Sequence, residues 1–288
     1  MSAQRLLVPL DGSELADCAL PWAILMAGLK GCELELLRCF EPPEEIFVVT
    51  DFLQPASDMT PTEVIRAKIE SYLAAKNAEL QPLVAVTSCL EGDPATRILE
   101  RVEDPSIEMV VMASHGRSGL GRWLLGSVST KVSRGLGSTP ILIVKATEKR
   151  RQPRLKRLLV PLDGSQRAEA ALSVAADLAS KSGASLHLYQ NVRITPLGHP
   201  ELDGSVQLEL ALAKTYLDQI KRRFPHLKIT TQAQISELKS GIVAQGEECD
   251  LIVMCSHGRS GAKRWLLGSI AESVLQKTTR PVLLIRPE

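Results

Sequence analysis

Two long loops, one in each half of the chain, carry the residue types best suited to chemistry. They run from Ala113 to Ser127 (ASHGRSGLGRWLLGS) and from Cys255 to Ser269 (CSHGRSGAKRWLLGS). In each loop nine residues separate an early glycine from a late one, namely Gly116 from Gly126 and Gly258 from Gly268. Glycine lets the backbone approach a ligand closely, and the unpaired amides at a helix start attract anions. This pattern predicts a phosphate-binding loop in each half.

Hydroxyl and guanidinium groups accompany these glycines. Ser127 follows the late glycine and is a candidate donor to a phosphate, and Arg117 and Arg122 would supply positive charge. An alternative interpretation needs no ligand, because serine often caps helices and Ser269 with Glu272 fits a capping box. A long loop with glycine, arginine and serine at both ends is unusual for a plain connection, which favours ligand binding.

Histidine and aspartate repeat at equivalent places in the two halves. His115 and His257 are candidates for a general base or a phosphate donor, or for hydrogen bonds to the loop backbone. The motif contains no partnered nucleophile, so no catalytic residue is assigned. Asp11 and Asp163 would contact ribose, a base edge or a metal beside phosphates, or else form an Asx-type turn or helix cap.

Other signatures and composition narrow the function classes. There is no Walker loop, and Gly119-Leu-Gly121 lacks the third glycine of a dinucleotide fingerprint. His187, His199 and His226 do not repeat and lack metal-ligand spacing, so no protein metal site is expected. The net charge is +1, the six cysteines form no C-x-x-C pair, and no apolar run approaches the about 18 residues of a membrane span. We expect a cytoplasmic protein that binds neither nucleic acid nor membrane.

An internal repeat sets the domain organisation. The sequence RLLVPLDGS occurs at Arg5–Ser13 and again at Arg157–Ser165, and the two glycine loops follow in the same order. A short basic segment between the copies has the composition of a linker. The predicted domains are therefore residues 1–146 and 157–288, joined by residues 147–156.

Each copy alternates strand-like and helix-like segments. In the first copy the predicted strands are Arg5–Leu10, Glu33–Phe40, Leu83–Leu90, Ile107–Ala113 and Pro140–Lys145. The predicted helices span Ser13 to Gly31 with a kink at Pro21, Pro61 to Leu80, Pro94 to about Glu103, and a last one from Ser127. The second copy follows the same plan. This order predicts an α/β fold with a parallel sheet, helices on both faces, and both loops at the carboxyl ends of strands, where ligands bind.

VPLDGS after the first strand, with SHGRSG and WLLGS after the fourth, resembles the universal stress protein family. The resemblance covers both copies and implies a tandem member. The nucleotide-binding members carry Gly, two residues, Gly, nine residues, then Gly-Ser or Gly-Thr. The resemblance implies that each copy is an open five-stranded parallel sheet of order 3-2-1-4-5. It also implies ATP as the ligand, with AMP or ADP as alternatives and Mg²⁺ as a companion of the nucleotide.

The same resemblance implies the residues of two nucleotide sites. Site one comprises Pro9, Asp11, Cys39, Ala113, His115, Gly116, Arg117, Gly126, Ser127, Val128 and Ser129. Site two comprises Pro161, Asp163, Asn191, Cys255, His257, Gly258, Arg259, Gly268, Ser269 and Ile270. The adenine is expected at the ends of the first and second strands, and the phosphates along the glycine loop.

Three departures from the family pattern rank site one above site two. Ala113 and Cys255 replace the first motif glycine, and the cysteine is the larger intrusion. The turn Gly92-Asp93-Pro94 has Gln234-Ile235-Ser236 as its ungapped counterpart, and Ala271 lacks a hydroxyl present in the first copy.

The leading hypothesis is a regulatory ATP binder in stress response. The alternatives are a slow Mg²⁺-dependent ATPase or phosphotransfer enzyme, and a protein-interaction module with vestigial sites. The last strands of the copies are expected to pair with each other as a pseudo-dimer, or with another chain in a homodimer.

Overall fold

The computed structural model describes residues 4–42, 60–80, 83, 85–115, 125–145, 152–192, 202–256 and 267–286. In the first half, residues 4–145, the elements are β1 (Arg5–Pro9), α1 (Glu14–Asp17), α2 (Leu20–Lys30), β2 (Glu33–Phe40), α3 (Pro61–Glu79), β3 (Ala85–Glu91), α4 (Pro94–Val102), β4 (Ile107–Ala113), α5 (Ser127–Gly135) and β5 (Ile141–Val144). In the second half, residues 152–286, they are β6 (Arg157–Leu162), α6 (Gln166–Ser182), β7 (Ser185–Val192), α7 (Leu202–Arg222), β8 (Ile229–Ile235), α8 (Leu238–Glu247), β9 (Leu251–Cys255), α9 (Ser269–Lys277) and β10 (Val282–Ile285).

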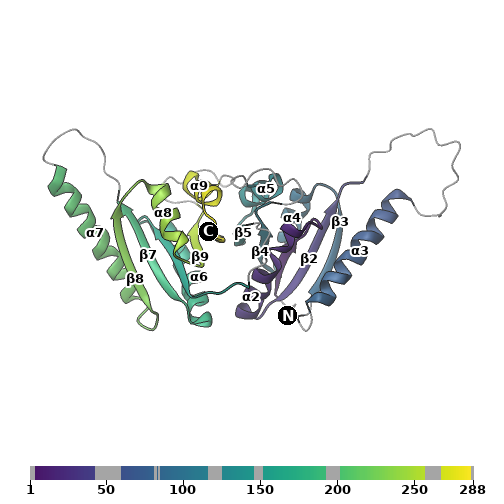
Figure 1. Ribbon diagram of the computed structural model, residues 1–288, viewed down its shortest axis with the longest axis horizontal. Coiled ribbons are helices and arrows are strands. Elements are labelled where there is room, and N and C mark those ends of the chain that lie inside the picture. Colours follow the sequence, from purple (N-terminus) through teal and green to yellow (C-terminus); the bar gives the residue numbers. More distant parts are fainter. Residues whose placement is uncertain are drawn as a thin grey trace.

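The strands form one ten-stranded sheet in the order β3-β2-β1-β4-β5-β10-β9-β6-β7-β8. Within each half the strands are parallel in the predicted order 3-2-1-4-5, which confirms the expected fold. The halves meet where β5 and β10 pair antiparallel, with Leu142 opposite Leu283 (Figure 1). Both strands are fully apolar and buried, so pairing them removes two exposed apolar edges.

Helices cover both faces of the sheet, as predicted. One core cluster packs α1, α2, α3, α6 and α7 against one face, and a second packs α4, α5, α8 and α9 against the other. Each cluster contains residues from both halves, so the hydrophobic core is continuous across the junction. In Figure 1, α5 and α9 lie next to each other at the centre, while α3 and α7 lie at the far ends.

The first predicted helix is two helices. Ser13 caps α1 by accepting a hydrogen bond from the amide of Ala16. Pro21 lies in the first turn of α2, where its missing N–H costs no hydrogen bond, so the chain breaks before the proline instead of kinking at it. Gly31 ends α2 with φ of +71°, a conformation that favours glycine.

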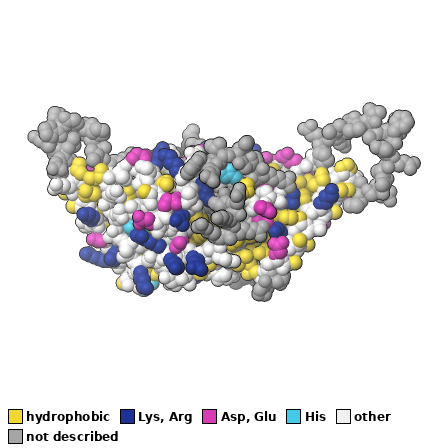
Figure 2. Space-filling view, viewed as in Figure 1, with side chains coloured by type: hydrophobic (Ala, Val, Ile, Leu, Met, Phe, Trp, Pro, Cys, Tyr) yellow, Lys and Arg dark blue, Asp and Glu magenta, His cyan; other side chains and the backbone are white. Residues whose placement is uncertain are grey.

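The surfaces of the two halves differ although their folds repeat. In the view of Figure 2, basic side chains gather over the second half, whereas hydrophobic side chains occupy much of the first-half surface beside the junction. Among the described helices, none combines the length and the apolar character needed to cross a bilayer. On the face seen in Figure 2, the two halves thus share their backbone fold but not their surface side chains.

Candidate functional site

The two predicted ligand segments begin side by side because β1 and β4 are neighbours in the sheet. These strands run parallel, with Leu7 paired to Val110, so both end at the same edge. Asp11 follows the end of β1, and Ser114 follows the end of β4. The amide of Gly126 donates to the carbonyl of Ser114 (2.8 Å), which returns the start of α5 to the end of β4.

Both helices that follow the glycine loops begin without a side-chain cap. Gly126 is the N-cap of α5 and Gly268 that of α9, and among the residues described neither cap makes a side-chain hydrogen bond. Ser127 and Ser269 are the first helical residues, and both side chains are exposed. The amides of each first turn are therefore available to an anion, and helix N-termini of this kind can bind phosphate.

The predicted capping box of Ser269 and Glu272 is wrong. Gly268 caps α9, and the carboxylate of Glu272 accepts instead from the guanidinium of Arg134 in the first half (2.8 Å). This partner is 138 residues away in the sequence. The serine caps that would explain Gly-Ser without a ligand are absent from α5 and α9 as described.

Gly126 lies where a side chain would not fit easily. A Cβ atom there would be 3.2 Å from the carbonyl oxygen of Ser114 and 3.5 Å from the Cα of His115. The hydroxyl of Ser129 lies 2.8 Å from the same carbonyl and 3.0 Å from that of Gly126, with Ser129 only 2% exposed. Ser129 thus ties the loop to α5, and its counterpart Ala271 cannot make this contact.

His115 presents a buried atom without a partner. Its Nδ1 lies 3.0 Å from the hydroxyl of Ser114, while its Nε2 is buried and has no hydrogen-bond partner in the described part of the chain. Burial and the charge of Lys145 lower the pKa of His115, so the imidazole is neutral at pH 7. A neutral imidazole with one unused nitrogen at this edge fits a phosphate or hydroxyl contact.

The aspartates after β1 and β6 form matching turns. Oδ1 of Asp11 accepts from the amide (2.9 Å) and hydroxyl (2.6 Å) of Ser13, and Asp163 makes the same contacts with Ser165 at the same distances. Gly12, between Asp11 and Ser13, has φ of +84°, so a side chain there would be strained. The Asx-type turn is present in both halves, and the serines rather than the aspartates cap the helices.

The ends of the second strands differ between the halves. Burial raises the pKa of the Cys39 thiol at the end of β2 to about 12, so this side chain stays neutral. At the equivalent place in β7, the amide nitrogen of Asn191 donates to the carbonyl (3.0 Å) and hydroxyl (2.5 Å) of Ser236. Because a carbonyl only accepts, the Oδ1 of Asn191 must point away, and it has no partner among the described residues. The expected adenine contact is thus small and neutral in site one and polar in site two.

The segment of the second half that corresponds to the turn after β3 lies two residues later than predicted. Phe40 of β2 pairs with Glu91, and Val192 of β7 pairs with Ile235. The segment 236–238, Ser-Glu-Leu, therefore matches Gly92-Asp93-Pro94, and segment 234–236 does not. Gly92 has φ of +124°, a conformation unsuited to the serine in the second half. Site two still lacks the glycine and the proline.

Cys255 fills space beside site two. Its sulfur lies 2.8 Å from the carbonyl of Arg167 in the first turn of α6, and burial raises the pKa of its thiol to about 11. Ala113 stands at the equivalent place in β4 and has no such reach. The expected intrusion in site two is therefore an uncharged thiol against the helix that follows Asp163.

The structure brings most of the predicted site residues to one edge of each half. Those at the described edge are Pro9, Asp11, Cys39, Ala113, His115, Gly126, Ser127, Val128 and Ser129 in the first half, and Pro161, Asp163, Asn191, Cys255, Gly268, Ser269 and Ile270 in the second. The remaining predictions, which are Gly116, Arg117, His257, Gly258 and Arg259, lie outside the described residues. In the described ranges no three His, Cys, Asp or Glu side chains are grouped for a metal ion.

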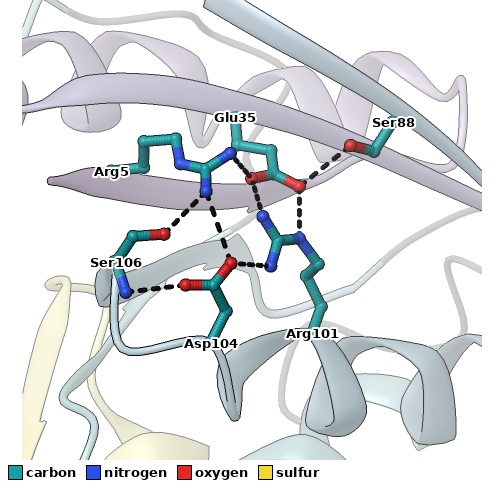
Figure 3. Close-up of polar contacts among 6 residues, drawn as sticks. All are labelled: Arg5, Glu35, Ser88, Arg101, Asp104 and Ser106. Carbon is teal, nitrogen blue, oxygen red and sulfur yellow. Dashed lines mark hydrogen bonds and ion pairs between the residues drawn. The ribbon is translucent and has the colours of Figure 1, made fainter. Parts of the chain in front are cut away.

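A buried ionic cluster that the sequence patterns did not predict lies at the opposite edge of the first half (Figure 3). Glu35 is fully buried and accepts from Arg5 (2.9 Å), from Arg101 (two contacts of 2.7 Å) and from Ser88 (2.9 Å). Arg101 also pairs with Asp104 (2.7 Å). A glutamate in the middle of an apolar strand was the available signal. The cluster lies near the amino ends of β1 and β2, so it holds the sheet and not a ligand.

Comparison with known proteins gives a consistent result. The model of the universal stress protein family matches residues 2–145 and again residues 154–286. A universal stress protein of Mycolicibacterium smegmatis is 29% identical over 98% of this chain and 97% of its own length. Universal stress protein Rv2005c of Mycobacterium tuberculosis is 35% identical over 62% of each chain. A solved universal stress protein of Archaeoglobus fulgidus shares the fold across 99% of both chains, with a TM-score of 0.69 and 22% identity.

Proposed function

The chain belongs to the universal stress protein family, and we propose that it is an ATP-binding member that acts as a regulatory nucleotide binder in stress response. It has two nucleotide-binding domains, residues 1–146 and 157–288, joined by the linker 147–156. Site one is the principal site, and site two binds more weakly. AMP and ADP are the alternative ligands, and Mg²⁺ would enter with the nucleotide.

The observation that carries the proposal is the uncapped start of α5 and of α9. In both halves a glycine amide is tied to the carbonyl after the fourth strand, at 2.8 Å for Gly126 and 2.9 Å for Gly268. This contact leaves the first-turn amides and an exposed serine at the edge where β1 or β6 also ends. Amides so arranged bind phosphate oxygens.

Three features support the ranking of the sites. Ser129 ties the loop to α5 in site one, and Ala271 lacks that contact. The imidazole of His115 offers an unused nitrogen within the described part of site one. Cys255 narrows the space beside Asp163 in site two.

The test begins with the purified full-length chain. Denaturation followed by mass spectrometry identifies any nucleotide that copurifies, and calorimetry with ATP, ADP and AMP gives the stoichiometry and affinities. Gly126→Val should block site one, because the added side chain meets the backbone of Ser114 and His115. Gly268→Val is the matching variant for site two, because Gly268 makes the equivalent amide contact with Ser256. We expect two ATP per chain for the wild type, with the tighter site lost in Gly126→Val.

Two results would overturn the proposal. Absence of nucleotide from the purified chain, together with no ATP binding by calorimetry, excludes a nucleotide binder and leaves the interaction module. Steady ADP release from ATP and Mg²⁺ that stops in His115→Ala and Asp11→Ala would instead assign the chain to the slow ATPase class.

A further inference from the structure

A cation at the end of the second half holds a helix of the first half. Arg286 directly follows β10, and its guanidinium donates to the carbonyls of Ser133 (2.7 Å) and Arg134 (2.8 Å). Both carbonyls belong to the last turn of α5. This is the helix whose amino end forms the phosphate-binding start of site one.

The reciprocal contact joins the first half to α9. Lys145 directly follows β5, and its ammonium donates to the carbonyl of Leu275 in the last turn of α9. Ser133 and Leu275 are equivalent, because each follows a valine whose carbonyl accepts the amide that ends its helix (3.0 Å in α5 and 2.9 Å in α9). The two contacts are therefore related by the same two-fold pattern as the pairing of β5 with β10.

Lys145 and Arg286 each also directly follow a residue whose carbonyl accepts a hydrogen bond from the start of the glycine loop in the same half. The amide of Ser114 donates to the carbonyl of Val144 (2.7 Å), and that of Ser256 donates to the carbonyl of Ile285 (2.9 Å). The carbonyls of Ser114 and Ser256 in turn accept from the N-cap glycines of α5 and α9. The end of each last strand thus touches its own site on one side and the opposite helix on the other.

Such a contact matters for helices of this size. Both α5 and α9 have nine residues, fewer than the roughly 12–15 that an isolated helix needs for stability in water. Carbonyls in the last turn lack partners within the helix, and a cation there also interacts favourably with the helix dipole. Since the amino end of each helix would hold the phosphates, a fixed carboxyl end keeps the amides aimed.

We propose that Arg286 is a positioning residue for site one and Lys145 is a positioning residue for site two. Each half then completes the nucleotide site of the other, and neither domain alone has a fully positioned phosphate helix. This inference rests on the proposed nucleotide binding at both sites.

The test uses full-length chains with one open site, Gly268→Val for site one and Gly126→Val for site two. Arg286→Gln and Lys145→Met are introduced into each chain, and ATP affinity is measured by calorimetry. We expect Arg286→Gln to weaken site one about two- to fivefold and leave site two unchanged. Lys145→Met should weaken site two by a similar factor and change site one less, because burial is the main cause of the lowered pKa of the nearby His115 and keeps it neutral. Arg286→Lys and Lys145→Arg keep the cation and should retain the affinity of the unsubstituted chain.

Matched controls remove a cation from the same helices without touching the crossed contacts. Lys131→Gln on α5 and Lys277→Met in the last turn of α9 change exposed side chains. Neither control should alter affinity at either site. Equal weakening of both sites by each variant, or no change in either, would overturn the positioning role.

A second readout separates this inference from the proposed function. Amide hydrogen exchange without nucleotide should increase in α5 for Arg286→Gln and in α9 for Lys145→Met. If exchange increases in these helices but no ATP binds, the proposed function is wrong and only the contacts of Arg286 and Lys145 with the opposite helices are supported. ATP binding without crossed exchange and without crossed affinity changes would remove the positioning role and leave the function.

Discussion

The carboxyl edges of the two halves keep the same backbone contacts, whereas the side chains around them have diverged. The turn after the first strand has equal distances in both halves, and the glycine amide before α5 or α9 reaches the same carbonyl. Around this frame, Cys255 replaces Ala113 and Asn191 replaces Cys39. Under the proposed function, the difference means that the backbone holds the frame for the phosphates, while base contacts and affinity depend on side chains that differ between the halves.

The amino edges diverge in a different way. Glu35 is buried among two arginines, while its counterpart His187 is buried with Thr230 (2.9 Å) and Gln245 (3.0 Å) as partners. Burial lowers the pKa of His187, which keeps the cluster neutral. A charged cluster in the first half and a neutral cluster in the second thus occupy the same place in the fold. This is possible because each buried group has its own set of partners.

The largest predicted difference between the halves concerns these clusters. Glu35→Ala should lower the free energy of unfolding by about 3 kcal/mol, because two partly buried guanidinium groups lose their buried carboxylate and keep only Asp104. His187→Leu should cost about 1–2 kcal/mol, because only neutral hydrogen bonds are lost. Urea denaturation measures both costs. Glu100→Ala is the control, because Glu100 is exposed and pairs with the half-exposed Arg97, so its loss should change the free energy of unfolding by about zero. Equal costs at the two positions would contradict the contrast.

A swap at the first motif position should move the two sites toward each other. Ala113→Cys forces a sulfur between β4 and α1 and should cost about 1–2 kcal/mol in stability, with weaker ATP binding at site one. Cys255→Ala removes the sulfur beside Arg167 and should strengthen binding at site two. Calorimetry on the single-site chains tests both directions. A change of the same sign at both sites would show that this position does not rank them.

The hydroxyl of Ser129 should account for about 1 kcal/mol of the difference. Ser129→Ala removes a buried hydrogen bond to the carbonyl of Ser114, and Ala271→Ser offers the same bond to the carbonyl of Ser256. We expect amide exchange at the start of α5 to become faster in Ser129→Ala. At the start of α9 it should become slower in Ala271→Ser. Hydrogen exchange at the two helix starts is the measurement. No change in the serine variant of α9 would indicate that its loop lies too far from the new hydroxyl.

Much of the fold followed from local patterns. The predicted strands Glu33–Phe40 and Ile107–Ala113 matched observed strands to the residue, because strands in the middle of a parallel sheet are rich in apolar residues. Gly31 and Ser13 marked a helix end and a helix start as predicted. The strand order came from the family resemblance, and the structure confirms it in both halves.

What the sequence could not predict depends on contacts between distant residues. The capping box failed because Arg134, in the other half, takes the carboxylate of Glu272. The pairing of β5 with β10 stayed open because an apolar edge strand suits either a second half or a second chain. The turn after β8 was misaligned because the second half is two residues shorter between this turn and the end of the fourth strand, at 20 residues from Ser236 to Ser256 against 22 from Gly92 to Ser114, which no local pattern reveals. The site residues that these contacts position remain predictions until binding is measured.

The smallest expected difference is a pH dependence confined to site two. Burial lowers the pKa of Lys145 to about 8, against a weaker opposing effect of Glu247, while Arg286 stays charged as arginine does. The nearby His115 has a lowered pKa and is neutral throughout, and Glu247 has a lowered pKa and stays ionised. Raising the pH from about 7 to about 9 therefore removes the charge of Lys145 and nothing else in this group.

Affinity and stability should respond with opposite signs. ATP affinity at site two should fall as pH rises through about 8, by no more than the effect of Lys145→Met, while site one holds. The unfolded chain binds this proton more tightly, so the free energy of unfolding should rise with pH between about 8 and the ordinary lysine value near 10.5. Titrations of both single-site chains at the two pH values test the first effect. Lys145→Arg should abolish it, and its persistence in that variant would assign the pH dependence to another group.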